Sequence, residues 1–278
     1  MIQLLGRADI RELADKLGVV PTKKLGQNFV TDPNTIRRIV GAAKLSGAEN
    51  VVEIGPGLGS LTLGLLEVAH SVTSVEIDAK MAAALEATIA LKAPGKTFTL
   101  VTHDAMTLQE LPVAPDALVA NLPYNISVPV LLNFMERFDS IAKGLVLVQA
   151  EVAHRLAAEP GSKTYGAPSA KLAWYANANL AGNVGRTIFW PVPNVDSALV
   201  YFERHQQPLG DEQLRQATFA VVDAAFSQRR KTLRQALADW AGSPARAEEI
   251  LIKAGVSPQS RGEALGIKEF VAIARANA

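Results

Sequence analysis

Four short apolar runs, each followed by a polar residue or a glycine, constrain the fold of this chain more than any other feature. The runs lead into Gly55, Glu76, Asp104 and Asn121, and stretches with helical periodicity separate the first three. Alternating strands and helices predict an α/β fold with an open parallel sheet. Because the carboxyl ends of parallel strands share one edge, where ligands bind, we expect these four residues to line one site.

The remaining segments extend this pattern. Strands are expected at 51–54, 71–75, 97–101, 117–121, 144–148, 184–189 and 198–203, the last of which closes the sheet. Helices are expected at 7–17, from 33 onward, and at 60–69, 80–91, 127–138, 151–158 and 170–178. Beyond a turn-rich junction, helices are expected at 212–225, 231–240, 245–254 and 267–276. We therefore predict an α/β domain at 1–205 and a smaller all-α domain at 206–278.

Composition excludes several classes of protein. The chain has no cysteine, which excludes disulfides and thiolate chemistry, and its four histidines are scattered, so we expect no metal site. No apolar run reaches the roughly 18 residues of a membrane span, and the first residues lack an apolar signal core. We expect a soluble, cytoplasmic protein, and a monomer, because no apolar stripe is left without a use.

The net charge of +1 hides an uneven distribution. Residues 1–50 carry 8 Lys or Arg and 5 Asp or Glu, residues 51–203 carry 9 and 14, and residues 204–278 carry 11 and 8. Basic ends around an acidic middle suit a protein whose ends hold an anionic polymer. A random scatter of surface charge fits the same numbers.

Two basic segments are candidates for nucleic-acid contacts. Arg229–Lys231, with Arg234 one turn further, form the densest basic cluster and are expected on a helix, where they suit phosphate contacts. A solvated helix face is the alternative. Lys163 and Tyr165 occupy the tip of a loop at 160–166, which is either a flap over nucleic acid or a plain surface loop.

Residues 121–124, Asn-Leu-Pro-Tyr, are an unusual end for a buried strand. Asn121 can donate and accept hydrogen bonds without titrating. Pro123 forces Leu122 into an extended conformation, which can turn its carbonyl outward. Tyr124 adds a flat face, and we expect this face to matter while the hydroxyl does not. Two acceptors and a stacking surface suit an exocyclic amino group on a flat base, although an ordinary turn fits the same residues.

The first strand runs into a glycine turn, Gly55–Gly59, which can bring the backbone close to a ligand. The full dinucleotide fingerprint is absent, because Ser60 stands where Gly or Ala is required, and a tight strand-to-helix turn is the alternative. Glu76 follows Gly57 by 19 residues, a spacing at which an acid accepts both ribose hydroxyls of an adenosine-containing cofactor. Asp104 can accept from an adenine amino group.

A further segment, 27–30, has apolar residues in an expected loop. Phe29 and Val30 must therefore cover something, either the core or a bound cofactor. In the second case Gln27 and Asn28 close the cofactor site from above.

Five segments, in this order along the chain, resemble motifs of the ribosomal RNA adenine dimethyltransferase family. They are LGQNF at 25–29, EIGPGLG at 53–59, NLPYNIS at 121–127, PGSKTYG at 160–166 and FSQRRK at 226–231. The resemblance covers nearly the whole chain. It implies a Rossmann-like S-adenosylmethionine-dependent methyltransferase sheet, a cofactor-covering segment at 1–48 and a helical RNA-binding domain at the C-terminus.

The resemblance also assigns roles to residues. S-adenosylmethionine would contact Asn28, Val30, Gly55, Gly57, Glu76, Asp104 and Asn121. Methyl transfer would involve Asn121, Leu122, Pro123 and Tyr124, with Tyr124 and Phe189 on either side of the target adenine. RNA would contact Lys163, Arg229, Arg230, Lys231 and Arg234.

The implied substrate is a pair of adjacent adenosines in the 3′-terminal hairpin of small-subunit ribosomal RNA, within a pre-30S particle. A large-subunit adenine methyltransferase of the macrolide-resistance type is the nearest alternative. A non-catalytic assembly or transcription factor on the same fold is another. The 160–166 loop and the long helical C-terminal part favour the small-subunit enzyme.

Overall fold

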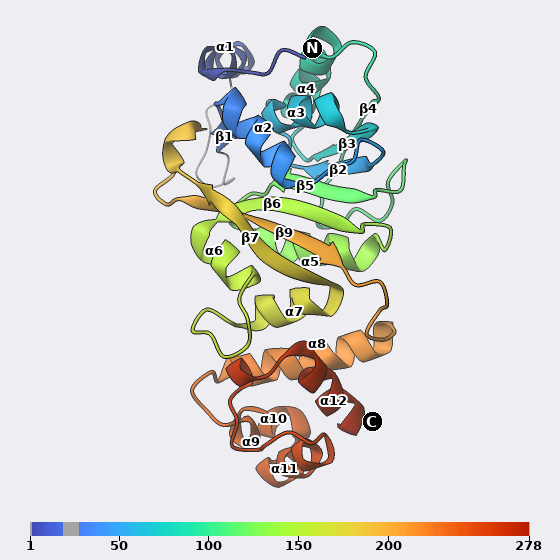
Figure 1. The fold of residues 1–278 in the computed structure, drawn as a ribbon, viewed down its shortest axis with the longest axis vertical. Coiled ribbons are helices and arrows are strands. Elements are labelled where there is room, and N and C mark those ends of the chain that lie inside the picture. Colours follow the sequence, from blue (N-terminus) through green and yellow to red (C-terminus); the bar gives the residue numbers. More distant parts are fainter. Residues whose placement is uncertain (1, 19–27, 278) are drawn as a thin grey trace. The chain divides into compact units, whose positions relative to one another are not determined.

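A computed structural model describes residues 2–18 and 28–277 of the chain (Figure 1). The segment from Pro21 to Gln27, and with it most of the first family-like motif, lies outside the described residues. None of the helices within the described ranges is long and apolar enough to cross a membrane.

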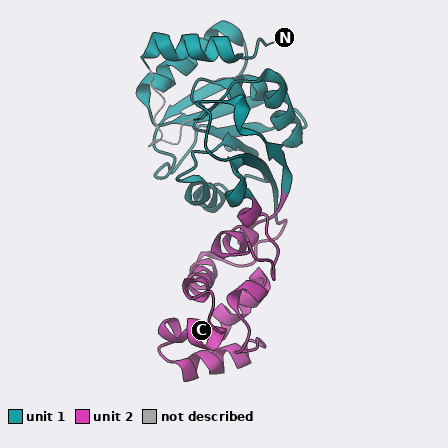
Figure 2. Ribbon diagram, turned by 90° about the vertical axis from the view of Figure 1, so that its left-hand side faces the viewer, with its two compact units in different colours: residues 1–153, 180–204 teal, residues 154–179, 205–278 magenta. Residues whose placement is uncertain are grey.

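The chain divides into two compact units, which Figure 2 colours separately. The first consists of residues 1–153 and 180–204, and the second of residues 154–179 and 205–278. Residues 154–179 lie before the domain boundary expected from the sequence, yet they group with the C-terminal helices. Their apolar side chains explain this, because Tyr165 and Ala170 belong to the hydrophobic core of the second unit.

Seven strands form the main sheet in the order β4-β3-β2-β5-β6-β9-β7. Their bounds are β2 Asn50–Ile54, β3 Ser71–Glu76, β4 Phe98–Thr102, β5 Ala117–Asn121, β6 Lys143–Gln149, β7 Ala176–Val184 and β9 Ser197–Arg204. The strands from β4 to β6 run parallel, and β9 runs antiparallel to β6. The predicted α/β fold with an open, mostly parallel sheet is confirmed.

The strand order reverses beside β2. Strands β3 and β4 continue to one side of it, whereas β5 returns to the other side, with Val51 opposite Ala117. Ligands of open α/β sheets bind at the carboxyl ends of the strands at such a switch point.

Helices of the first unit pack on this sheet through apolar faces. They are α1 Arg7–Leu17, α2 Pro33–Ala42, α3 Ser60–Val68, α4 Ala79–Lys92, α5 Ser127–Arg137 and α6 Ala150–Leu156, although the last residues of α6 belong to the second unit. The predicted start of α2 is confirmed, because the Asp32 side chain accepts from the Thr35 N–H and Pro33 occupies the first turn. One core cluster joins α1–α4 to the sheet through residues such as Ile36, Val72 and Leu145.

The second unit is helical apart from its share of β7. Its helices are α7 Ala167–Tyr175, α8 Glu212–Ser227, α9 Leu233–Ala236, α10 Ala238–Ala241, α11 Pro244–Lys253 and α12 Ile267–Asn277. Aromatic rings link its core: Tyr165 lies 5.9 Å from Phe226, and Phe226 lies 6.0 Å from Phe270, between ring centroids.

Several predicted elements are wrong. The helix expected to reach residue 178 ends at Tyr175, and β7 begins at Ala176. The strand expected at 184–189 is not continuous, because β7 ends at Val184, a 3-10 turn forms at Arg186–Ile188 and β8 begins at Phe189. Strand β9 does not close the sheet, because β7 lies outside it. The alternation Ala-Asn-Ala-Asn at 176–179 has little propensity of its own, so tertiary pairing decides its structure.

Two further corrections concern short segments. Phe29–Val30, expected in a loop, form β1, which pairs antiparallel with β8, Phe189–Trp190. The helix expected at 231–240 is two short helices, α9 and α10, and Thr232 precedes the first of them.

Glu49 anchors the loop that precedes β2. Its carboxylate accepts from the Ser46 and Gly47 N–H groups and from the Ser46 hydroxyl, and it lies 2.8 Å from Lys143 Nζ at the start of β6. Burial alone raises the pKa of Glu49, but the Lys143 ion pair and the Ser46 donors outweigh burial and lower it to about 2.

Replacing this carboxylate should flatten the acid limb of the stability curve. The unfolded chain titrates near 4.5, so Glu49 contributes stability that is complete above about pH 5 and is lost as pH falls toward 2. We expect Glu49→Gln to lower the free energy of unfolding by about 1–3 kcal/mol at pH 7 and by less at pH 3. Urea unfolding at both pH values measures this, with exposed Glu86→Gln as control. Equal losses at the two pH values would contradict the assignment.

Candidate active site

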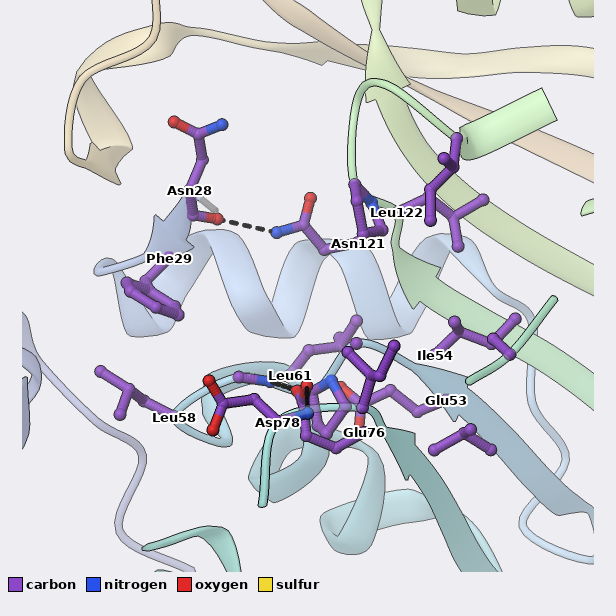
Figure 3. Close-up of a pocket in the computed structure, with 18 of the residues that line it drawn as sticks. Asn28, Phe29, Glu53, Ile54, Leu58, Leu61, Glu76, Asp78, Asn121 and Leu122 are labelled. Carbon is purple, nitrogen blue, oxygen red and sulfur yellow. Dashed lines mark hydrogen bonds between the residues drawn. The ribbon is translucent and has the colours of Figure 1, made fainter. Parts of the chain in front are cut away.

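A cavity of about 330 Å³ lies at the carboxyl ends of β2, β3 and β5 (Figure 3). Gly55, Glu76, Asp104 and Asn121, the four residues at which the apolar runs end, all line it. The parallel strands bring these residues to one edge of the sheet. The cavity therefore occupies the switch point at which the fold predicts a ligand.

The glycine turn forms one wall, and its shape requires glycine. Gly55 and Gly57 have φ angles of +65° and +55°, in the left-handed region that side chains disfavour. A Cβ on Gly57 would lie 2.7 Å from Cε1 of Phe29. The Phe29 ring in turn stacks on Trp190, with centroids 6.2 Å apart. Strand β1 is thus packed directly against the backbone of the turn.

Two buried carboxylates face the same cavity. Glu76 accepts from the N–H groups of Gly57 at 3.3 Å and Asp78 at 3.0 Å, and burial raises its pKa. Glu53 accepts from the hydroxyls of Thr62 and Ser74 at 2.6 and 2.8 Å. Burial raises the pKa of Glu53 to about 7, and the charge of Glu76 adds to this effect. A cationic ligand would offset the cost of holding both carboxylates here.

Sequence reasoning assigned Glu53 no role. The signal was present, since an acidic residue interrupts the apolar run of β2. An isolated acid within a buried strand needs hydrogen-bond donors or a ligand, and Glu53 has two hydroxyl donors and lines the cavity.

Asn121 ends β5 beside the residues that precede β1. Its side-chain N–H donates to the backbone carbonyl of Asn28, with 2.9 Å between nitrogen and oxygen (Figure 3). Because a carbonyl only accepts, the amide nitrogen must face Asn28 and the amide oxygen must face away. The next residue is fixed as well, because the Leu122 N–H donates to the Leu147 carbonyl at 3.1 Å.

All seven residues expected at the cofactor line the cavity, together with Leu122 and Pro123. The seven are Asn28, Val30, Gly55, Gly57, Glu76, Asp104 and Asn121. Asp104 uses Oδ1 to accept from the Met106 N–H at 2.8 Å.

The two aromatic residues expected at the target base are placed differently. Tyr124 is half-buried and does not line the cavity, although Pro123 and Asn125 on either side of it do, and its hydroxyl is 2.6 Å from Ser197 Oγ. Phe189 is completely buried in the core cluster. The structure does not bring Phe189 to the cavity, so stacking on it would require β8 to move.

The basic residues of the second unit do not lie on one helix face as expected. Arg229–Lys231 lie in the turn between α8 and α9, and Arg234 lies in α9. Helix α8 ends before Gln228, and α9 begins after Thr232. Three of these basic residues therefore lie in a loop between two helices and not on a helix surface.

Two of these arginines are engaged by carboxylates. Arg229 Nε lies 3.1 Å from Glu263 Oε2, and Arg229 also donates to the Lys163 carbonyl at 2.5 Å. Arg234 Nε lies 2.7 Å from Glu248. The side chains of Arg230, Lys231 and Lys163 are exposed.

The loop at 160–166 is fixed to the same place. The Gly161 N–H donates to the Glu263 carbonyl at 2.7 Å, so Arg229 and Glu263 together hold both ends of Pro160–Lys163. Tyr165 was expected at the loop tip but is buried in the core of the second unit, where it contacts Phe226. The loop and the basic turn therefore form one surface.

The residues around the cavity fit a cationic ligand with polar groups, as S-adenosylmethionine is. The hydroxyl of Ser60, at the start of α3, is buried without a hydrogen-bond partner in the described part of the chain. The glycine turn exposes its backbone along the cavity wall and leaves no room for a Cβ on Gly57 beside Phe29, and two carboxylates favour positive charge. Within the described ranges, no cluster of three or more His, Asp or Glu could hold a metal ion.

Comparison with known proteins agrees with this geometry. Residues 21–277 match the family model described as Ribosomal RNA adenine dimethylase. Ribosomal RNA small subunit methyltransferase A of Streptomyces coelicolor is 61% identical over 274 residues, which cover 98% of this chain and 96% of that protein. The protein of the same name from Leifsonia xyli subsp. xyli is 58% identical over 275 residues, which cover 98% of each chain.

Solved structures share the fold. A dimethyladenosine transferase from Plasmodium falciparum matches with a TM-score of 0.75 at 22% identity, over 88% of this chain and 95% of that one. The 23S rRNA methyltransferase ErmE matches with a TM-score of 0.65 at 26% identity, over 90% and 99%. The family match over almost the whole chain, together with these relatives, shows that the protein belongs to the ribosomal RNA adenine dimethylase family of S-adenosylmethionine-dependent methyltransferases.

Proposed function

We propose that this protein methylates the exocyclic N6 of two adjacent adenosines in the 3′-terminal hairpin of small-subunit ribosomal RNA, twice on each base. It would act in the cytoplasm, as a monomer, on a pre-30S particle. The observation that carries the chemistry is the fixed amide of Asn121, whose oxygen faces away from Asn28 beside the cofactor cavity. The small-subunit target is supported by relatives of 58–61% identity that bear that name.

Two alternatives are weaker. The support for a large-subunit target is the name of a structural relative, a 23S rRNA methyltransferase that is 26% identical to this chain. A purely structural assembly factor or a transcription factor would not need the cavity or the oriented Asn121 amide.

The cofactor would lie along the edge of the sheet. Glu76 would accept the ribose hydroxyls, and Asp104 would accept from the adenine amine with the oxygen that Met106 leaves available. The glycine turn would pass beside the methionine part, and Asn28 and Val30 would cover it. When bound, S-adenosylmethionine supplies a methyl group activated by its sulfonium.

The chain itself must make the adenine amine nucleophilic, because its lone pair is delocalised into the ring. The Asn121 amide oxygen and the Leu122 carbonyl would accept its two N–H groups. This draws the nitrogen toward a tetrahedral shape and localises the lone pair. A strong base is unnecessary, since the nitrogen becomes more acidic as the methyl group arrives. Orientation of the reactants can contribute several kcal/mol.

The target base must leave its stack before it reaches these acceptors, at a cost of a few kcal/mol. Stacking on an aromatic side chain offsets about 1–3 kcal/mol of this cost. Tyr124 follows Leu122 by two residues and is half-buried, whereas Phe189 is completely buried, so Tyr124 is the ring that we favour for this role. The role of Phe189 stays a prediction.

Asn121→Ala should keep cofactor binding and lose most turnover, by about 100-fold or more, because one of the two acceptors is gone. Asn121→Asp should also fail, since a carboxylate cannot donate to the Asn28 carbonyl. Cofactor affinity by calorimetry and single-turnover methylation measure the two effects, with exposed Asn183→Ala as control. Unchanged turnover in Asn121→Ala would remove this residue from the mechanism.

Gly57→Ala should weaken S-adenosylmethionine binding by about tenfold or more, because the new Cβ collides with Phe29 and strains the turn. Gly95→Ala is a matched control, since Gly95 also has a positive φ, of +78°, but a Cβ there would meet nothing within 4 Å beyond its chain neighbours. Calorimetric titration compares the two. An equal loss of affinity in both variants would show that the close contact between Gly57 and Phe29 does not matter for cofactor binding.

Arg230→Ala with Lys231→Ala should weaken RNA binding and reduce the slope of log affinity against log salt by about 1.5, as for two phosphate contacts. Arg229→Ala should instead lower stability, because Arg229 holds the 160–166 loop. Binding of the 3′-terminal hairpin over a salt series measures this, with Arg11→Ala plus Lys96→Ala as control. An unchanged slope would mean that the pair is merely solvated.

One experiment separates the proposed function from its alternatives. The protein is incubated with labelled S-adenosylmethionine and unmethylated small or large ribosomal subunits. We expect label on two adjacent adenosines of the small subunit. Label on the large subunit supports the first alternative, and binding without label supports the second.

A further inference from the structure

Tyr124 is held at two points. Its backbone lies in the turn after β5, where the Ile126 N–H donates to the Pro123 carbonyl at 3.2 Å. Its hydroxyl lies 2.6 Å from Ser197 Oγ. A tyrosine side chain has two rotatable bonds, so fixing its backbone and its far end also fixes the tilt of the ring. Sequence reasoning expected the hydroxyl to be without effect.

Ser197 is well placed to act as this anchor. It begins β9, opposite Gln149 at the end of β6, and its side chain is completely buried. Because β9 runs antiparallel to β6, its first residue lies at the edge where the parallel strands end. Ser197 therefore contacts the Tyr124 side chain, although the two residues are 73 positions apart in the chain.

The residue before Ser197 fixes the anchor itself. The Asp196 carbonyl accepts from the Ala150 N–H at 2.9 Å, and its carboxylate accepts from the Arg186 N–H at 3.1 Å. These bonds join the start of β9 to the end of β6 and to the segment before β8. Burial raises the pKa of Tyr124, and the nearby Asp196 charge adds to this, so the phenol keeps its proton at neutral pH.

We propose that Ser197 is a positioning residue for methyl transfer: its hydroxyl bond to Tyr124 sets the plane on which the target adenine stacks. The proposal rests on the proposed function, in which Tyr124 receives the base. It adds a residue to that site that contacts neither cofactor nor substrate. A ring free to tilt would still bind the base but would present its amine poorly to Asn121 and Leu122.

A double-mutant cycle tests this. Tyr124→Phe and Ser197→Ala should each lower the single-turnover methylation rate on unmethylated small subunits by about tenfold, roughly the effect of one hydrogen bond. The double variant should be no slower than either single variant, because both remove the same bond. Ser197→Thr keeps the hydroxyl and should restore the rate. Cofactor affinity should stay unchanged in all four variants.

Two control variants remove a serine hydroxyl and a tyrosine hydroxyl at other places in the structure. Ser71→Ala, at the amino end of β3, deletes another serine hydroxyl bond, to Asn50 at the start of β2, and Tyr201→Phe deletes the tyrosine bond to Glu203 within β9. Both should methylate at the normal rate. If Ser197→Ala fails to fold, Tyr124→Phe and Ser197→Thr still decide the question.

The outcomes are distinct. Normal rates in Tyr124→Phe and Ser197→Ala, or losses that multiply in the double variant, would overturn the positioning role. If Tyr124→Ala alone is then slow, stacking on Tyr124 stands and only the anchor fails. A normal rate in Tyr124→Ala would instead refute the proposed stacking itself.

Discussion

The bond from the Asn121 amide to the Asn28 carbonyl is the constraint on which the site depends. It joins residues 93 positions apart and sets which atom of the amide faces away from Asn28 and would meet a substrate in the proposed function. An amide free to rotate would offer its N–H groups as readily as its oxygen, and an N–H group repels another N–H group. A backbone carbonyl as partner removes that choice without adding a charge. In the proposed mechanism, neutral acceptors would be sufficient, because the nucleophile is a neutral amine.

In the proposed function, the charged residues of this site lie on the side that would hold the cofactor. Glu53 and Glu76 are buried near each other, and loss of water raises the pKa of each carboxyl. Such a pair is unfavourable in an empty cavity and favourable beside a sulfonium and an ammonium group. The chain thus separates two tasks at one sheet edge: carboxylates at the ends of β2 and β3 suit a cation, while the amide and carbonyl after β5 suit a neutral base.

Sequence patterns predicted the parallel sheet and its ligand edge, because each strand is a local apolar run with an abrupt polar end. The common direction of the strands was enough to predict that four residues would lie together: Gly55, Glu76, Asp104 and Asn121. The errors lie where tertiary pairing outweighs local signals. Residues 176–179 alternate Ala and Asn, which is a weak local signal, and they form the first part of β7. The bond between Tyr124 and Ser197 leaves no trace in either local sequence, since an antiparallel strand creates it.

The basic turn shows why counting charges from sequence overstates a binding surface. Four cations within six residues suggest four phosphate contacts, yet Arg229 and Arg234 lie against Glu263 and Glu248, which follow 34 and 14 positions later. An arginine that bridges a carboxylate and the Lys163 carbonyl has its planar donors directed by protein atoms. Arg229 therefore holds Lys163 and the basic turn together in one surface. Arg230 and Lys231 are exposed, and they are the side chains that we propose contact phosphates.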